Sequence, residues 1–263
     1  MPDTPASLSV RSTDGTRIAF DRLGDGPPLV LVEAAGHYRD FSSFGGLAPL
    51  LSRDFTVYAY DRRGRGDSTD TTPYAPEREV EDLAALIAEA GGPADVYGYS
   101  SGALLAMRAA AHGLPIGRMA LLEPPLQDDG AEPPESDLTT ELAELVGAGR
   151  NGDAVEHFHH SIGVPAEFVA SMRSAPEWTK MESVAHTLVY DCIISDTTTS
   201  AVLRSVEVPT LVLDSMGSSD NLTGWAATVA GQLPHGSHRS LAGEWHTVRD
   251  ETLAPVLVEF FHG

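Results

Sequence analysis

The sequence predicts a doubly wound α/β domain, in which helices cover both faces of a mostly parallel β-sheet. Short apolar segments alternate with longer segments of helical periodicity along most of the 263 residues, and this alternation is typical of a parallel sheet. Segment 29–32 contains only Leu and Val, as expected of a strand buried on both faces. Such sheets bind ligands at the carboxyl ends of their strands, so the loops there are where we expect a functional site.

The first half of the chain gives the clearest local signals. Residues 7–10 and 17–22 alternate around Asp14-Gly15, which predicts a β-hairpin. Segment 76–90 has an apolar stripe and acidic residues in its first turns, where the helix dipole favours them. The other elements expected in this half are strand 29–32, helix 40–52, strand 55–60, strand 95–97, helix 103–111 and strand 118–123.

A long segment then interrupts the alternation. Residues 126–205 contain no clear strand, and their apolar residues recur at helical spacing. The alternation resumes with strand 209–214, helix 222–233, strand 236–241 and helix 252–261. We therefore expect a core formed by residues 1–125 and 206–263, with a helical cap inserted over 126–205.

Composition excludes several classes of function. The formal net charge of −21 disfavours nucleic acid and anionic membranes as partners. Cys192 is the only cysteine, so no internal disulfide is possible. The N-terminus lacks the basic start and apolar stretch of a signal peptide, and no apolar run is long enough for a membrane helix. We expect a cytoplasmic protein, monomeric or homodimeric, that acts on a small molecule.

The stretch Gly98-Tyr99-Ser100-Ser101-Gly102 lies between an apolar strand and a run of strong helix formers. A serine between two glycines at such a joint is typical of a nucleophile elbow, where strand and helix nearly touch. Ser100 has glycine two residues before and two residues after it, whereas Ser101 has Tyr99 and Ala103 at those positions, so Ser100 is the expected nucleophile. The backbone N–H of Ser101 is then one half of an oxyanion hole. The alternative is a glycine-rich turn without chemistry.

Other candidates lie in the insertion and before it. Phe158, Trp178 and Met181 either line an apolar substrate pocket or form the core of the cap. Adjacent histidines in 157–160 point in different directions on a helix, so we expect no metal site there. The arginines of 61–68 either bind a substrate carboxylate or hold the fold together.

The chain resembles the α/β-hydrolase superfamily over essentially its whole length. The resemblance rests on Leu29-Val30-Leu31-Val32, on the segment 60–68, on the elbow, on 209–213 and on Gly243-Glu244-Trp245-His246. It implies a sheet of about eight strands, with the helical cap inserted after the sixth strand and lying over the active site. It does not imply a substrate, because this fold hosts many reactions.

The resemblance also implies a general base and the second half of the oxyanion hole. His246 precedes the last helix, where the superfamily keeps its catalytic histidine. Ala35 matches the residue after the usual His-Gly pair of the oxyanion loop, and its backbone N–H can serve whatever its side chain. Glu33 replaces that histidine and brings a carboxylate close to the substrate pocket, either as a tether for the loop or as a sign of altered chemistry.

The triad acid has two candidates. The superfamily usually keeps it in the loop after strand 209–214, where an ungapped match places Ser218, while Asp220 follows closely and Asp214 ends the strand. Glu123 is the rival, because it ends the strand after the elbow, where haloalkane dehalogenases can place their acid. We favour Glu123 and retain Asp220 as the alternative acid.

These residues predict a serine hydrolase that cleaves an ester, lactone or thioester of a small to medium, largely apolar substrate through an acyl-enzyme. No metal or organic cofactor is expected. The alternatives are a cofactor-free acyl transfer or cyclisation in a biosynthetic pathway, and a non-catalytic protein that binds a small ligand on the same fold.

Overall fold

In a computed structural model, which describes residues 8–126 and 137–263, one eight-stranded sheet forms the centre of the molecule. The strands lie in the order β1-β2-β4-β3-β5-β6-β7-β8. The pairs β1–β2 and β2–β4 are antiparallel, and every later pair is parallel. The predicted mostly parallel sheet of about eight strands is therefore confirmed. The strands are β1 (Leu8–Arg11), β2 (Arg17–Leu23), β3 (Pro28–Val32), β4 (Thr56–Tyr60), β5 (Ala94–Tyr99), β6 (Ile116–Leu122), β7 (Thr210–Ser215) and β8 (Gly236–Leu241).

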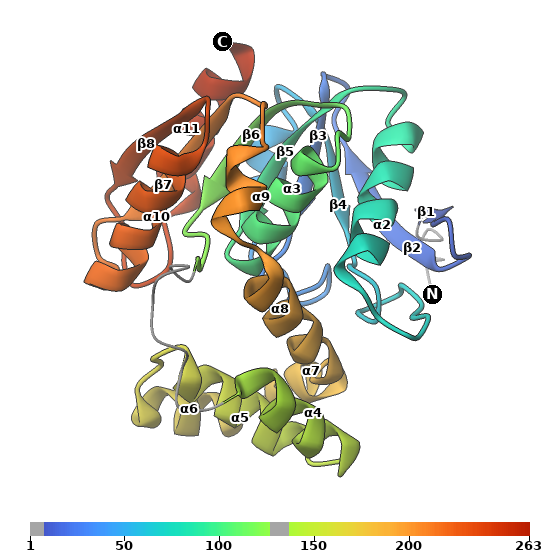
Figure 1. The fold of residues 1–263 in the computed structure, drawn as a ribbon, viewed down its shortest axis with the longest axis vertical. Helices are drawn as coiled ribbons and strands as arrows, with labels where there is room; N and C mark the ends of the chain where they lie inside the picture. The colour runs from blue at the N-terminus through green and yellow to red at the C-terminus, as the bar shows by residue number, and fades with distance from the viewer. Residues whose placement is uncertain (1–7, 127–136) are drawn as a thin grey trace.

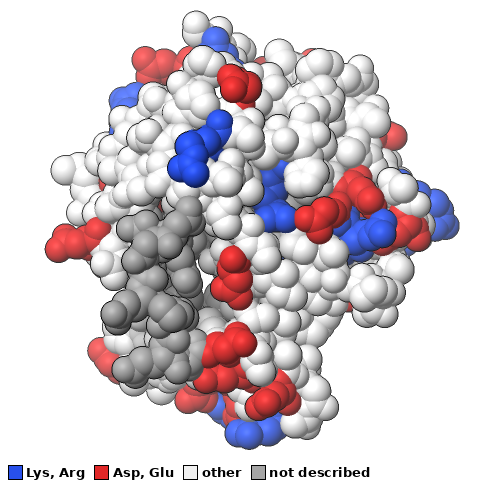
Figure 2. Space-filling view, in the orientation of Figure 1, with Lys and Arg blue, Asp and Glu red and all other residues white. Residues whose placement is uncertain are grey.

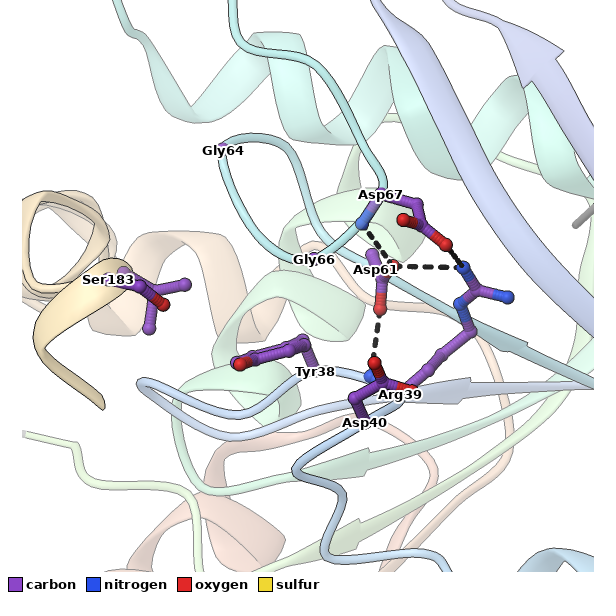
Figure 3. Close-up of a pocket in the computed structure, with 9 residues that line it drawn as sticks. Tyr38, Arg39, Asp40, Asp61, Gly64, Gly66, Asp67 and Ser183 are labelled. Carbon is purple, nitrogen blue, oxygen red and sulfur yellow. Dashed lines mark hydrogen bonds and ion pairs between the residues drawn. The ribbon is translucent and has the colours of Figure 1, made fainter. Parts of the chain in front are cut away.

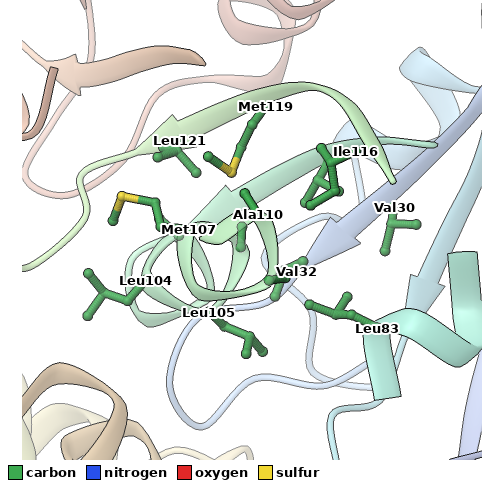
Figure 4. Close-up of a cluster of buried hydrophobic side chains, with 14 of the residues drawn as sticks. Val30, Val32, Leu83, Leu104, Leu105, Met107, Ala110, Ile116, Met119 and Leu121 are labelled. Atoms are coloured by element: carbon green, nitrogen blue, oxygen red, sulfur yellow. The ribbon is translucent and has the colours of Figure 1, made fainter. Parts of the chain in front are cut away.

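Helices cover both faces of the sheet, as the doubly wound pattern predicts (Figure 1). One face packs against α2 (Pro76–Glu89), α3 (Ser101–Ala111) and α10 (Asp220–Gln232). The other packs against α1 (Leu47–Leu51) and α11 (Asp250–His262). Figure 4 shows how α3 fills the first of these layers, with Leu104, Leu105 and Met107 pointing among side chains of β3, β6 and α2. Burial of this apolar surface on both faces is the main source of stability.

The helix expected over 40–52 is shorter than predicted, because only Leu47–Leu51 is α-helical. Residues 38–46 form a loop closed by a bridge between Tyr38 and Phe41, and Gly45-Gly46 precedes the helix. Glycine is a poor helix former, and the two adjacent glycines delay the start of the helix. The longer loop lies next to the carboxyl end of β3, where the site is expected.

The cap consists of the helices α4–α9, which lie between β6 and β7 as predicted. In Figure 1 most of the cap forms a separate layer below the carboxyl ends of the strands, and α8 and α9 lead back to the core. Acidic side chains gather over this layer in the lower part of Figure 2, which agrees with the strongly negative net charge. The cap helices are α4 (Leu138–Gly147), α5 (Asn151–Ser161), α6 (Ala166–Arg173), α7 (Trp178–Ser183), α8 (His186–Thr197) and α9 (Ser200–Arg204).

Over 8–126 and 137–263, the structure contains no helix with the length and apolar character needed to cross a membrane.

Candidate active site

Ser100 lies at the joint between β5 and α3, with backbone angles φ 54° and ψ −121°. A positive φ is strained for any residue with a side chain. The flanking glycines explain why the strain persists. A Cβ on Gly98 would lie 2.7 Å from the Cα of Ala103, and a Cβ on Gly102 would lie 2.2 Å from the carbonyl oxygen of Val32. The predicted close approach of strand and helix at this turn is therefore confirmed.

A carboxylate and an imidazole meet at the same edge of the sheet. Oε2 of Glu123 lies 2.5 Å from Nδ1 of His246, within hydrogen-bond distance. The Glu123 side chain is fully buried and that of His246 is 15% exposed, so solvent screens the pair little. The carboxylate holds the ring nitrogen Nδ1, so Nε2 is the nitrogen of His246 that does not face Glu123.

The other oxygen of Glu123 is held by the loop after β7. Oε1 accepts hydrogen bonds from the backbone N–H of Ser215 at 2.7 Å and from the hydroxyl of Ser218 at 2.6 Å. Ser218 Oγ also accepts from the backbone N–H of His246 at 2.8 Å. Burial opposes ionisation of Glu123, but the hydrogen bonds from His246, Ser218 and Ser215 outweigh it and lower the pKa of this carboxyl. Glu123 is thus an anion with two fixed oxygens.

Backbone strain also marks these residues. In the described part of the chain, Ser100, Glu123 and His246 are the only non-glycine residues with positive φ, at 54°, 47° and 54°. Strain of this kind persists where the surroundings over-determine the conformation, and it clusters at functional sites. The backbone geometry therefore selects the same residues as the hydrogen bonds and the motif.

The rival carboxylates have other positions. Asp220 is the first residue of α10, and the helix is capped by the side chain of Ser219 instead. Asp214 is buried and bonds His238 and Ser240 on β8. At the position where the superfamily usually has its acid, the chain has Ser218, whose hydroxyl joins Glu123 to the His246 loop. The geometry favours Glu123 over Asp220 as the partner of His246.

The two candidate oxyanion-hole residues come from different segments, since Ser101 follows Ser100 at the start of α3 and Ala35 lies in the loop after β3. Ser101 is the first residue of α3, and N–H groups of a first turn have no partner within the helix. Ala35 follows β3 and packs against the apolar cluster of the cap. Arg65 donates to the carbonyl oxygens of Ala34 at 2.7 Å and His37 at 3.1 Å, on either side of Ala35. Their role as an oxyanion hole stays a prediction.

Glu33 lies at the end of β3 and is 3% exposed. Its Oε1 accepts from the hydroxyl of Ser42 at 2.5 Å and from the N–H of Ser43 at 3.0 Å, whereas its Oε2 is buried without a hydrogen-bond partner. Burial raises the pKa of Glu33 to about 7, although the bonds from Ser42 and Ser43 oppose the shift. Glu33 therefore tethers the 38–46 loop, and its ionisation above neutral pH adds an unbalanced charge beside the candidate oxyanion hole.

We expect Glu33→Gln to remove a pH-dependent loss of stability. A carboxyl whose pKa rises from 4.5 to about 7 on folding stabilises the fold fully below pH 4.5, and this contribution is lost as the pH rises through 7. Between pH 5 and pH 8 the wild type should lose about 2–3 kcal/mol of unfolding free energy relative to the variant. Urea unfolding at both pH values measures this difference. An identical pH dependence in the two proteins would contradict the assignment of the raised pKa to Glu33.

The three predicted pocket residues of the cap all contribute to its apolar cluster, and one of them also lines a cavity. Phe158 and Trp178 belong to the buried apolar cluster of the cap, which favours the core alternative for these two residues, and their role as pocket residues stays a prediction. Their large apolar rings bring α5 and α7 into the same buried cluster. Met181 does line a small cavity of about 20 Å³ next to Ala35. The other residues around this cavity are Gly36, His37, Phe41, Val155, His159 and Leu188.

A larger hollow of about 340 Å³ separates the cap from the loops after β3 and β4. Figure 3 shows its wall, where Arg39 bonds Asp61 and Asp67 while Tyr38 faces Ser183 of the cap. The walls of the hollow are therefore polar, and the guanidinium of Arg39, which lines it, is paired with two carboxylates. It lies on the same side of the sheet as the carboxyl ends of β3 and β4.

The arginines of segment 61–68 serve the fold. Arg62 and Arg65 are 0% and 1% exposed and are paired with carboxylates, so neither is free to bind a substrate carboxylate. One of those carboxylates, Asp191 of α8, is absent from the sequence-based candidates. No motif marks it, and the signal in the sequence is a charged residue among the apolar residues Leu188, Cys192 and Ile194 of the same helix.

The fold and the geometry of this site place the protein among the α/β hydrolases. Residues 29–254 match the model of the Alpha/beta hydrolase family, and the chain therefore belongs to that family. The crystal structure of an alpha/beta hydrolase from Sphaerobacter thermophilus is 49% identical, with a TM-score of 0.89, and the match covers 97% of this chain and 100% of that one.

Two further relatives are more distant. N-formylmaleamate deformylase from Pseudomonas putida is 32% identical over 156 residues, which is 56% of this chain and 57% of that enzyme. The chain thus matches little more than half the length of this curated relative. An esterase from Exiguobacterium antarcticum has a TM-score of 0.77 at 16% identity, with 98% and 100% of the two chains covered, which shows a common fold.

Proposed function

We propose that this protein is a serine hydrolase that cleaves an ester, lactone or thioester through an acyl-enzyme. The observation that carries the proposal is the hydrogen bond of 2.5 Å between Glu123 and Nδ1 of His246, at the same sheet edge as the strained Ser100. A serine hydroxyl is a weak nucleophile and needs a base, and an imidazole held at Nδ1 presents Nε2 for that purpose.

The proposed reaction uses side chains, backbone N–H groups and water. Ser100 attacks the carbonyl carbon while Nε2 of His246 takes the hydroxyl proton, and Glu123 stabilises the imidazolium that forms. The N–H groups of Ala35 and Ser101 bind the oxyanion of the tetrahedral intermediate. His246 then gives the proton to the leaving group, and a water molecule activated by the same nitrogen releases the acyl group from Ser100.

The surroundings of Ala35 support a small, apolar acyl group. The adjacent cavity of about 20 Å³ has Met181, Leu188 and Val155 in its wall, and burial of a single methylene in such a place is worth about 0.8 kcal/mol. The matched deformylase, by its name, removes a formyl group, the smallest acyl group. Both points favour short acyl chains over long ones.

A fluorophosphonate probe tests the proposal, because it reacts with an activated serine. We expect the wild type to be labelled, with the probe on the peptide that contains Ser100, and Ser100→Ala to remain unlabelled. The labelled enzyme should lose its activity toward p-nitrophenyl acetate and short-chain thioesters. A wild type that is neither labelled nor active on any member of an ester, lactone and thioester panel would favour a protein that binds a ligand without catalysis.

A further inference from the structure

One carboxylate of the cap, that of Asp191, is buried in the core next to the nucleophile elbow. Asp191 lies on α8, which runs from the outer cap helices to the core in Figure 1, and it is 3% exposed. Its Oδ1 accepts from the hydroxyl of Ser101 at 2.8 Å and from Nη1 of Arg62 at 2.7 Å. Its Oδ2 accepts from Nη2 of Arg65 at 2.6 Å. One cap residue thus contacts the Ser101 side of the candidate oxyanion hole directly and the Ala35 side through Arg65.

On the elbow side the contact is direct. Ser101 follows the nucleophile, and its hydroxyl is fixed by Asp191 while its backbone N–H is a candidate donor to the oxyanion. Arg62 reinforces this side, because Nη1 lies 3.3 Å from Ser101 Oγ and 3.3 Å from the carbonyl oxygen of Glu33. Glu79 holds the remaining edge of the Arg62 guanidinium through two bonds of 2.7 and 2.9 Å.

On the loop side the contact passes through Arg65. Its Nη2 binds Asp191, and its Nη1 binds the carbonyl oxygens of Ala34 and His37. A guanidinium is planar and rigid, so it fixes the distance between these groups. The loop that carries the N–H of Ala35 is therefore attached to α8, and through Asp191 it is attached to Ser101.

We propose that Asp191 is a positioning residue of the cap, which holds the N–H groups of Ala35 and Ser101 at the separation that the oxyanion requires. The catalytic consequence rests on the proposed function, whereas the attachment of the loop to α8 does not. In this proposal the cap also contributes to catalysis, because the N–H groups of Ala35 and Ser101 keep their separation only while α8 is packed against the core.

The electrostatics make Asp191 hard to replace. Arg62, Arg65, Glu79 and Asp191 carry two charges of each sign and are all buried. Burial opposes ionisation of Asp191, but Arg65 and Arg62 and the bond from Ser101 outweigh it and lower its pKa. Removal of this charge leaves an unbalanced guanidinium in the core, and a guanidinium without its partner moves toward other acceptors.

Asp191→Asn tests the proposal, with Asp196→Asn as the matched control. Asp196 lies on the same helix, but it is exposed and accepts a bond of 2.6 Å from Thr139 of the cap. In hydrogen exchange followed by mass spectrometry, we expect amides of 33–38 and of the first turn of α3 to exchange about tenfold faster or more in Asp191→Asn. The control should match the wild type there.

Kinetics supply the second measurement. With active sites counted by the fluorophosphonate probe, kcat of Asp191→Asn on p-nitrophenyl acetate should fall about 10- to 100-fold, while KM changes less than about threefold. Inhibition by phenylboronic acid, which forms a tetrahedral adduct on the serine, should weaken in parallel, since the adduct needs the same hole. A purely structural role would lower the number of active sites and leave kcat per site unchanged.

The outcomes separate the two proposals. If Asp191→Asn exchanges faster than the wild type, but the wild type is neither labelled by the probe nor active, the attachment by Asp191 is retained and the proposed function is overturned. Unchanged exchange and kcat in folded Asp191→Asn, or a raised KM at unchanged kcat, would overturn the positioning role. If Asp191→Asn does not fold, Arg65→Lys replaces it, because lysine keeps the charge but has one nitrogen in place of the two that bind Asp191 and the carbonyls separately. The same pattern is then expected, and a wild-type pattern contradicts the proposal.

Discussion

Ser100→Ala should lower kcat by about 10⁴-fold or more, on the scale of triad deletions in other serine hydrolases. The variant keeps the fold, because alanine is smaller than serine and the flanking Gly98 and Gly102 still permit the turn. It loses the atom that forms the covalent bond. Steady-state kinetics on the best ester of the panel, together with loss of fluorophosphonate labelling, measure the effect.

Ser101→Ala is the matched control for this prediction. It removes a hydroxyl that donates to Asp191 at 2.8 Å but keeps the backbone N–H. We expect a loss below about tenfold, because a single buried hydrogen bond to a charged group contributes about 1.5–3 kcal/mol and only part of that reaches the transition state. If Ser101→Ala were inactive and Ser100→Ala active, Ser100 would not be the nucleophile.

Glu123→Gln should lower kcat by about 10²–10⁴-fold, approaching the loss on neutralisation of a triad acid. Glutamine keeps the length and volume of the side chain. One of its two terminal atoms is now an N–H donor, however, and both oxygens of Glu123 accept hydrogen bonds from His246 on one side and from Ser215 and Ser218 on the other. The variant therefore misplaces the imidazole or its proton, and it cannot stabilise the imidazolium. Single-turnover acylation separates this effect from slow release of the acyl group.

Asp220→Asn is the control for the acid. Asp220 begins α10, whose cap is the side chain of Ser219, so the change removes only one favourable charge from a first turn. We expect less than about a tenfold change in kcat. A larger loss for Asp220→Asn than for Glu123→Gln would return the acid to the loop after β7.

The sequence predicts those parts of the molecule that local patterns determine. The elbow is visible because steric demands of one turn select Gly98 and Gly102. Glu123 is a candidate because it ends the strand after the elbow, where the resemblance to haloalkane dehalogenases allows the acid. The role of Ser218 is less accessible, since a serine at the usual acid position gives no sign that it holds an acid from another strand.

Contacts between distant segments could not be predicted in this way. Asp191 meets Arg62 and Arg65 across more than 120 residues of chain, and no spacing rule connects them. From the sequence, Phe158 and Trp178 are compatible with either a pocket or a core position, because an apolar ring on a helix does not indicate whether that face packs against protein or lines a cavity. The short α1 shows a third limit, since Gly45-Gly46 outweighed the apolar pattern around it.

The starting point of the cap has a consequence for protein engineering. In the sequence, the cap helices come after β6 and Glu123. The helix α8 leads back to the core, where its Asp191 binds Ser101. A graft that exchanged the whole insertion for that of another family member would remove the ion pairs of Asp191 with Arg62 and Arg65 and change the backbone that follows Glu123, the proposed triad acid. Altered substrate range is therefore better sought by point changes on α5 and α7, around Val155 and Met181, than by the transplantation of an entire lid.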